Sequence, residues 1–328
     1  MNAKYIIFEG IYGYSKYVFN DLQNDVNCFF AKTTFESIIG KINLFHTSEK
    51  ANRYINLPLK SIWYNKYMDK IPNDSGEQWI VIFAEGCRLA YDSHFINKLR
   101  KRYNKLKIVY YFLNSTVQLS DKRINYINTT FDIVVSYDRA DCKKYDWYYY
   151  CGIYCADNTP DEIKNEELTD VFFVGRDKGR LEDIHKAYKL FVISGLKCDF
   201  YVIDVPKEKQ TVEGIHYNEF LPYNETLKKV RRTRILYEIV QKEQTGCTFR
   251  TYEAILYHKI LVSNNIQLQS MRIYDSQNMI LYKNITDIDV NALLQCTYVE
   301  MNTSQNILSP YFFLDFLEGV INNESISK

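Results

Sequence analysis

The chain lacks several features that would place it in a class at once. Its 328 residues hold no apolar run of the roughly 18 residues that a membrane-spanning helix needs. No secretory hydrophobic segment opens the sequence, where Lys4 and Glu9 bracket a short apolar run. The cysteines are scattered, and Cys151 and Cys155 have no second pair or histidine cluster beside them, which argues against zinc. We therefore expect a cytoplasmic protein with reduced thiols.

An excess of one charge is also missing. Lys and Arg number 41 against 40 Asp and Glu, a net charge of +1, so we expect no nucleic-acid partner. None of the 5 histidines lies in a Ser/His/Asp or metal-binding spacing. Walker, Gly-x-Ser-x-Gly, His-Glu-x-x-His and Asp-x-Asp motifs are absent as well. We expect no cofactor and no metal.

Short apolar runs alternate with amphipathic stretches, which predicts parallel sheets flanked by helices. The length favours two domains. A polar segment at residues 160–167 is the predicted linker. In the first half, strands are expected at residues 5–8, 26–31, 79–84, 107–113 and 131–136, and helices at 15–22, 59–68, 93–103 and 139–145. In the second half, strands are expected at 170–174, 198–203, 235–240, 260–263 and 279–282, and helices at 180–194, 223–231, 248–257, 285–295 and 311–321.

This alternation predicts an α/β protein with two Rossmann-like, doubly wound domains facing across a cleft. We place the first domain at residues 1–158 and the second at 159–310. Ligands of such folds bind beyond the carboxyl ends of the strands.

The segment at residues 245–254 predicts a strand, a tight turn at Gly246 and a helix. Thr248 can cap that helix, whose N-terminal N–H groups would suit an anion. Glu253, one or two turns on, could accept hydrogen bonds from sugar hydroxyls, so the segment fits a nucleotide sugar. An ordinary αβ unit with a capped helix explains the pattern equally well.

A basic loop follows the first predicted strand of the second domain. Arg176, Lys178 and Arg180 could neutralise a diphosphate, and Gly175 permits close approach of the backbone. The alternative is a solvated loop with ordinary surface charges. Its place at a carboxyl edge favours the first interpretation.

Two loops of the first domain have the equivalent position. Glu9 and Gly10 follow the first strand, but the third glycine of a dinucleotide fingerprint is missing, which makes an NAD site a weak hypothesis. After the strand at 79–84 come four candidates for the acceptor site. Glu85, Asp92 or His94 could take a proton from an acceptor hydroxyl, with Arg88 beside them. A surface ion pair between Arg88 and Asp92 is the alternative.

The basic runs at residues 98–107 and 228–234 are expected to be mainly solvated helix faces. The first run could also rest on an anionic membrane surface.

Taken together, these segments resemble the GT-B-fold glycosyltransferases, and more closely small bacterial transferases of capsule or lipopolysaccharide assembly. The likeness is carried by residues 131–138, 141–145, 170–180, 195–198, 221–223, 246–254 and 259–265. It implies a hexosyltransferase-type enzyme with a UDP- or GDP-sugar donor in the second domain. It also implies a glycan or lipid-linked oligosaccharide acceptor in the first domain, and a final helix at 311–328 that packs back toward that domain.

By the same resemblance, Glu253 corresponds to the ribose-binding carboxylate, within a donor site that includes Gly246, Thr248 and Arg250. Many retaining members carry a second Glu where this chain has Thr245, and Glu243 is out of register. The stereochemical outcome therefore stays open.

The leading hypothesis is a metal-independent glycosyltransferase, with Glu85, Asp92 or His94 as catalytic base and Glu9, Gly10 and Arg88 at the acceptor or cleft. A sugar-nucleotide epimerase of the same shape is one alternative, disfavoured by the scarcity of histidine. A non-catalytic sugar-binding scaffold, suggested by Thr245, is the other. Peripheral membrane contact would accompany a lipid-linked acceptor.

Overall fold

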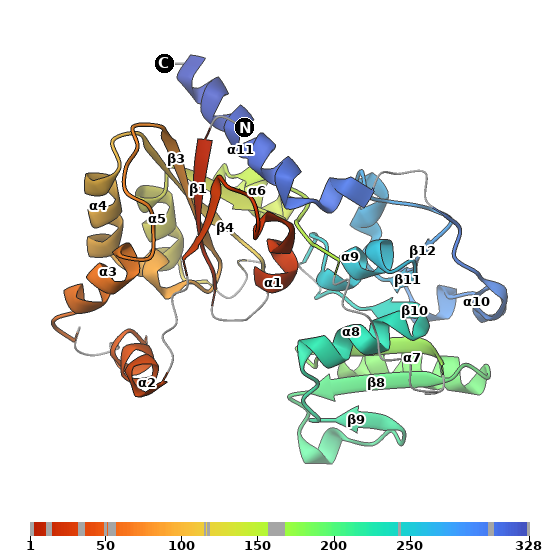
Figure 1. The fold of residues 1–328 in the computed structure, drawn as a ribbon. Helices are drawn as coiled ribbons and strands as arrows, with labels where there is room; N and C mark the ends of the chain where they lie inside the picture. The colour runs from red at the N-terminus through yellow and green to blue at the C-terminus, as the bar shows by residue number, and fades with distance from the viewer. Residues whose placement is uncertain are drawn as a thin grey trace. The chain divides into compact units, whose positions relative to one another are not determined.

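The chain folds into two compact α/β units, Met1–Cys155 with Leu308–Lys328 (unit 1) and Ala156–Ile307 (unit 2). The structure is a computed structural model that describes residues 3–10, 15–31, 37–48, 51, 57–114, 116, 119–156, 168–241, 244–300 and 305–326. Within these residues each unit has a 6-stranded parallel sheet with helices around it (Figure 1). The predicted class of two doubly wound α/β domains is confirmed. The predicted linker at 160–167 lies outside the described residues.

The sheet of unit 1 has the strand order β2-β1-β3-β4-β5-β6. Neighbouring strands are parallel, and Ile6 of β1 lies opposite Val81 of β3 in the register. The prediction omitted α5 and β6, and it extended α1 into what is a separate 3-10 turn. The strands are β1 (Ala3–Phe8), β2 (Cys28–Ala31), β3 (Gln78–Ala84), β4 (Leu106–Tyr111), β5 (Ile133–Ser136) and β6 (Tyr148–Tyr149). The helices are α1 (Ser15–Val18), η1 (Asn20–Leu22), α2 (Ser37–His46), α3 (Ser61–Met68), η2 (Arg88–Tyr91), α4 (Ser93–Arg102), α5 (Asp121–Thr130), α6 (Arg139–Tyr145) and, after η7 (Gln305–Leu308), α11 (Pro310–Ile326).

Two layers of helices cover the sheet of unit 1. On one face, the rings of Phe8 and Phe83 stack with centroids 4.8 Å apart, and Phe95 of α4 meets Phe8 edge-on. The other face is covered by α11, which comes from the far end of the chain. Phe313 of that helix packs on Tyr111 of β4, with ring centroids 4.8 Å apart. Unit 1 is thus completed by residues that follow unit 2 in the sequence.

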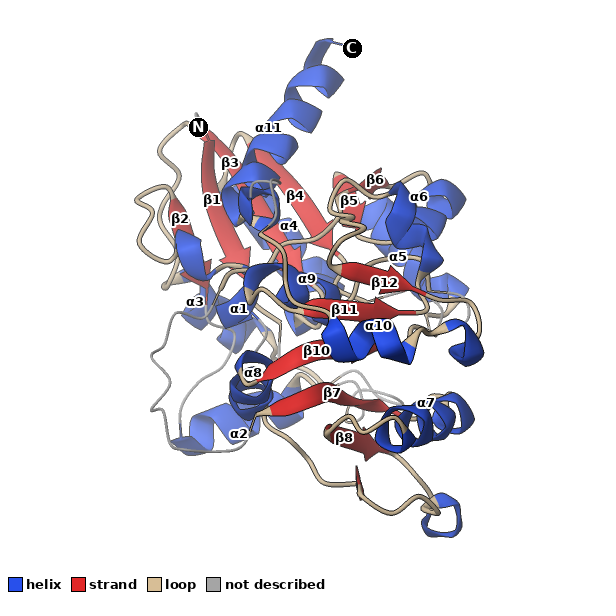
Figure 2. Cartoon of the chain, turned by 90° about the vertical axis from the view of Figure 1, so that its right-hand side faces the viewer, coloured by secondary structure: helices blue, strands red, loops and turns tan. Residues whose placement is uncertain are grey.

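The sheet of unit 2 has the order β12-β11-β10-β7-β8-β9 (Figure 2). This is the Rossmann order, in which the chain starts at a central strand, builds outward to one side, and then returns to build the other. Helices α7 and α10 pack on one face, and α8 and α9 on the other. The strands are β7 (Thr169–Arg176), β8 (Cys198–Ile203), β9 (Ile215–Tyr217), β10 (Thr233–Glu238), β11 (Ile260–Ser263) and β12 (Met279–Leu281). The helices are α7 (Leu181–Ile193), η4 (Lys207–Lys209), α8 (Tyr223–Arg231), α9 (Phe249–Leu256), η5 (Ile266–Ser270), η6 (Ile285–Asp287) and α10 (Val290–Gln295).

Two details of unit 2 differ from the prediction. Strand β9 was not expected, because three residues carry too little pattern to stand out. The helix expected at 285–295 is divided into η6 and α10. Asp289 causes the division, since its carboxylate accepts a hydrogen bond from the Ala292 N–H and begins a new helix there.

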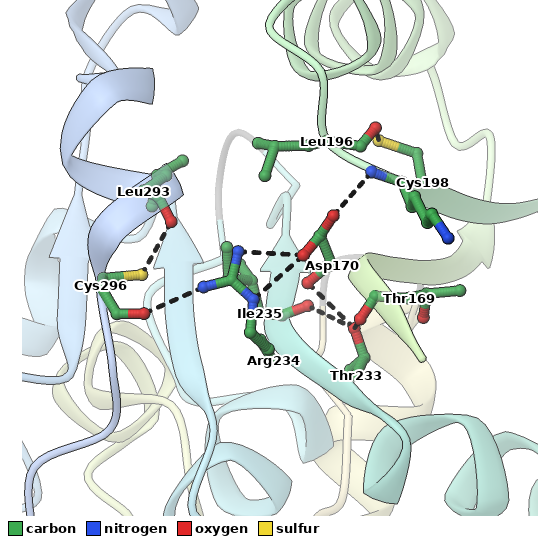
Figure 3. Close-up of polar contacts among 10 residues, drawn as sticks. Thr169, Asp170, Leu196, Cys198, Thr233, Arg234, Ile235, Leu293 and Cys296 are labelled. Carbon is green, nitrogen blue, oxygen red and sulfur yellow. Dashed lines mark hydrogen bonds and ion pairs between the residues drawn. The ribbon is translucent and has the colours of Figure 1, made fainter. Parts of the chain in front are cut away.

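The amino ends of β7 and β10 are joined by an ion pair (Figure 3). The Asp170 carboxylate accepts hydrogen bonds from Arg234 Nε at 3.0 Å and from the Lys197 N–H at 2.9 Å. Arg234 Nη1 also donates to the Cys296 carbonyl at 3.0 Å, beyond the end of α10. These contacts give the amino edge of the sheet a structural role.

We predict that Phe313→Ala lowers the free energy of unfolding of unit 1 by about 3–5 kcal/mol, because a fully buried ring is lost. Urea unfolding followed by tryptophan fluorescence measures this unit selectively, since Trp63, Trp79 and Trp147 all lie in it. Phe312→Ala is the matched control, because that ring is 50% exposed. Equal losses in the two variants would contradict the role of α11.

Candidate functional site

The candidate site lies at the carboxyl edge of unit 2, where the strand order reverses between β7 and β10. Ligands of Rossmann-type sheets bind at this reversal, because the loops on its two sides diverge. The loop after β7 carries the predicted basic residues, and the segment after β10 leads to α9 with Thr248 and Glu253. The topology therefore brings the two predicted donor-binding segments to one edge of one sheet.

The loop after β7 is shorter than predicted. Gly175 and Arg176 still belong to the strand, and the chain then turns through Lys178 (φ 44°) and Gly179 (φ 79°), both left-handed. The Arg180 N–H donates to the Asp177 carbonyl at 2.9 Å and closes the turn. The Asp177 carboxylate accepts from the N–H groups of Arg180 and Leu181 at 3.1 and 3.0 Å. An internal carboxylate thus caps the start of α7.

The three predicted cations have different surroundings. Arg180 donates to the carbonyls of Arg176, at 2.7 Å, and of Ile239, so it clamps the loop to the end of β10. Gly175 leaves room for this clamp, since a Cβ there would lie 3.5 Å from Arg180 Nη2 and 3.1 Å from the Phe173 ring. Arg176 forms an exposed ion pair with Asp204 at 2.5 Å.

Lys178 is the exposed cation of this loop. Desolvation, and then the charges of Arg180 and Arg176, lower the pKa of its ammonium group. Neighbouring positive charges that repel one another attract a polyanion such as a diphosphate. Lys178 therefore remains the strongest of the three predicted diphosphate contacts.

Thr248 is confirmed as the N-cap of α9: its Oγ1 accepts a hydrogen bond from the Arg250 N–H at 3.0 Å. The tight glycine turn before it is wrong, because residues 239–247 separate β10 from the cap. Gly246 is buried instead, and its carbonyl accepts from Asn265 Nδ2 at 3.1 Å. The anchor of this long connection is a side chain, not a glycine pivot.

That anchor is Glu238, a buried carboxylate that the sequence analysis missed. Oε1 accepts hydrogen bonds from the hydroxyls of Thr248, at 2.5 Å, and Thr251, at 3.0 Å. Oε2 accepts from Ser263 at the end of β11. The available signal was a carboxylate inside the apolar run at residues 235–240, since a buried charge requires dedicated partners.

Glu253 lies fully buried on α9. Its Oε1 accepts hydrogen bonds from Tyr223 Oη at 2.5 Å and Arg250 Nη2 at 3.0 Å. Its Oε2 is 2.5 Å from Arg250 Nη1, although this second contact lacks hydrogen-bond geometry. Burial raises the pKa of Glu253, and the charge of Arg250 opposes the rise. A ligand hydroxyl would reach this carboxylate only by displacing Arg250 or Tyr223.

The equivalent edge of unit 1 holds Gly10 and Glu85 against each other. A Cβ on Gly10 would lie 2.2 Å from the Glu85 carbonyl oxygen, so only glycine fits where the loops after β1 and β3 touch. The Glu85 carboxylate accepts from the N–H groups of Leu113 and Asn114 at 2.8 and 2.6 Å. Burial raises its pKa, while these two N–H groups lower it. Glu9 is half-buried in the adjacent loop.

The other candidates of unit 1 lie around the start of α4. Asp92 caps this helix, accepting from the N–H groups of His94 and Phe95 at 3.1 and 3.2 Å. Arg88 donates to the Leu44 carbonyl at 2.8 Å, in place of the alternative ion pair with Asp92. His94 is exposed in the first turn. Glu85 alone of the three proposed bases combines burial with a raised pKa.

Metal and membrane features were also sought among the described residues. These residues contain no group of three or more His, Cys, Asp or Glu side chains placed to hold a metal ion. None of the helices in this part of the chain is long and apolar enough to cross a membrane. All 8 cysteines lie within the described ranges and are free thiols.

The sequence matches no protein-family model and no curated protein. Among solved structures, an alpha-glucosyltransferase in complex with UDP and a 13-mer DNA aligns over 90% of this chain and 88% of its own, at 13% identity and a TM-score of 0.51. A UDP-N-acetylglucosamine 2-epimerase structure from Listeria monocytogenes aligns over 93% and 90%, at 10% identity and a TM-score of 0.48. A glycosylation-associated protein complex from Streptococcus agalactiae aligns over 82% of this chain, at 11% identity and a TM-score of 0.42, and the chain spans 58% of that protein's length. The likeness is one of fold, and the fold is of the GT-B type.

The raised pKa of Glu253 predicts a pH-dependent stability. Between the ordinary glutamate pKa of about 4.3 and the raised folded value, the folded state binds more protons than the unfolded state. The wild-type protein therefore loses stability as pH rises through this range. Glu253→Gln does not titrate, so we expect its stability relative to wild type to increase with pH, by about 1.4 kcal/mol for each unit of the shift.

Calorimetric unfolding of the full chain between about pH 4 and 8 measures this difference. Glu208→Gln, at an exposed position in η4, is the control and should give a difference that stays constant with pH. A constant difference for Glu253→Gln as well would contradict the raised pKa.

Proposed function

We propose that this protein is a glycosyltransferase that moves a hexosyl group from a nucleotide-sugar donor to a glycan or lipid-linked acceptor. One observation carries the proposal: a cationic loop and a helix with a buried carboxylate flank the strand-order reversal of unit 2. Phosphate groups and ribose hydroxyls are complementary to these two features. The shared fold with an enzyme solved in complex with UDP supports a nucleotide sugar as donor.

In this proposal the donor diphosphate lies near Lys178, Gly175 and the start of α9. Positive charge there would stabilise the leaving nucleoside diphosphate, whose negative charge grows as the glycosidic bond breaks. Arg250 lies at the first turn of α9 and could move from Glu253 to the phosphates, which would open the carboxylate to ribose hydroxyls. Arg180 and Thr248 hold the two segments in place, and Arg176 and Gly246 complete the surroundings.

The acceptor is proposed to bind unit 1, with Glu85 as the first candidate for catalytic base. A carboxyl group of raised pKa exchanges protons nearer to neutral pH, which suits deprotonation of an acceptor hydroxyl. Asp92 and His94 are the other candidates. Glu9, Gly10 and Arg88 belong to the same acceptor proposal. We further propose bacterial capsule or lipopolysaccharide assembly as the setting, from the sequence resemblance alone.

We predict that UDP or GDP binds more tightly than the matching nucleoside, and that Lys178→Ala removes most of this difference. One charge-assisted contact, at about 1.5–3 kcal/mol, corresponds to roughly 10-fold or more in affinity. Titration calorimetry measures both ligands on both proteins. Lys207→Ala, at an exposed position in η4, is the control of equal charge. Equal losses for nucleoside and diphosphate would exclude a phosphate contact.

Turnover tests the reaction itself. We expect release of nucleoside diphosphate to rise when an acceptor glycan is added, and Glu85→Gln to lower turnover about 10²–10⁴-fold with nucleotide affinity unchanged. Asp92→Asn and His94→Ala are measured in parallel to locate the base. Nucleotide release without any acceptor, together with inversion at a sugar carbon, would favour the epimerase. Binding with no release would favour the scaffold.

A further inference from the structure

Helix α2 presents an apolar stripe to the outside of unit 1. Ile38, Ile42 and Phe45 follow one another at spacings of four and three residues, and their exposed fractions are 73%, 54% and 67%. Ile39 beside them is 46% exposed. Single exposed apolar residues are common, but a continuous helical stripe of this kind marks an interaction surface.

The opposite side of α2 is held firmly against α3, so the stripe cannot simply turn inward. Asn43 is buried and its Oδ1 accepts a hydrogen bond from Tyr67 Oη at 3.0 Å. His46 Nδ1 accepts from Trp63 Nε1 at 2.7 Å. Figure 1 shows α2 beside α3 in unit 1. The orientation of the helix therefore directs Ile38, Ile42 and Phe45 outward.

The helices next to the stripe carry charge of one sign. Over their described bounds, α2, α3 and α4 contain no Asp or Glu, although the whole chain is nearly neutral. Arg100 is paired with Asp132, and Arg102 donates to main-chain carbonyls at the end of α3, so these two have structural partners. Lys41 and Lys101 are exposed. The Lys and Arg residues of the three helices are Lys41, Lys66, Lys98, Arg100, Lys101 and Arg102.

We propose that α2 docks unit 1 on the surface of an anionic lipid bilayer. Ile38, Ile42 and Phe45 would enter the boundary between headgroups and acyl chains, with the helix axis in the membrane plane. The neighbouring cations would meet the anionic headgroups. Nucleic acid fits less well, because phosphate contacts leave an apolar stripe exposed to water. The proposal goes beyond sugar transfer and does not depend on it, although a lipid-linked acceptor would lie at the same surface.

Vesicle flotation of the full-length protein tests the docking directly. Phosphatidylcholine vesicles are compared with vesicles that contain about one third phosphatidylglycerol, at low and high salt. We expect binding to the anionic vesicles that weakens as salt rises, since screening reduces the headgroup attraction. The variant Ile38→Ser/Ile42→Ser/Phe45→Ser should lose at least about 10-fold in affinity. The variant Lys41→Gln/Lys101→Gln should lose mainly the preference for anionic lipid.

The chain offers a matched control in unit 2. Val192, Ile193 and Phe220 are exposed by 45%, 85% and 77%, and their triple serine variant should bind vesicles like the wild type. Circular dichroism of each variant establishes that it is folded.

Three results would overturn the proposal. One is equal vesicle binding by the wild type and the α2 variant. Another is the absence of vesicle binding together with a dimer, seen in sedimentation, that the α2 substitutions dissociate. The third is binding to a DNA duplex in preference to anionic vesicles. Because no donor or acceptor sugar is present, none of these outcomes bears on the proposed transferase activity.

Discussion

The buried carboxylate of Glu238 is the contact on which the candidate site of unit 2 depends. It receives hydroxyl hydrogen bonds from Thr248 and Thr251 on the α9 side and from Ser263 at the end of β11. A charge removed from water is tolerated only when such donors replace its hydration. Through Thr248 the same carboxylate fixes where α9 begins, and the positions of Arg250 and Glu253 follow from that start.

Local signals explain which parts of this structure could be predicted from the sequence. Strands such as β11 and helices such as α6 and α8 were predicted to the residue, because their apolar periodicity is complete within a few residues. The Thr248 cap is equally local. By contrast, the partners of Glu238 and Glu253, and the packing of α11 on unit 1, join residues far apart in the sequence. No local pattern encodes such pairings, so the sequence pointed to Glu253 but not to Tyr223.

The basic loop after β7 shows the same limit for chemistry. In the sequence, Arg176, Lys178 and Arg180 look alike, since each is a cation spaced two residues from the next. In the structure Arg180 becomes a backbone clamp and Arg176 an ion-pair partner of Asp204, whereas Lys178 stands exposed in a left-handed turn. Charge composition can therefore suggest an anion-binding loop, but hydrogen bonding decides which cation is available to the anion.

The enclosure of Glu253 constrains how strongly it could contribute to binding a nucleotide. Its carboxylate already accepts hydrogen bonds from Tyr223 and Arg250, so a ribose hydroxyl would replace an existing donor and not fill an empty position. The net gain is then the difference between two hydrogen-bonded states, which is small compared with either bond alone. The displaced Arg250 could recover the difference only by meeting another anion, and the phosphates of the same ligand would supply one. In this arrangement, recognition of ribose and of diphosphate would be coupled through a single arginine.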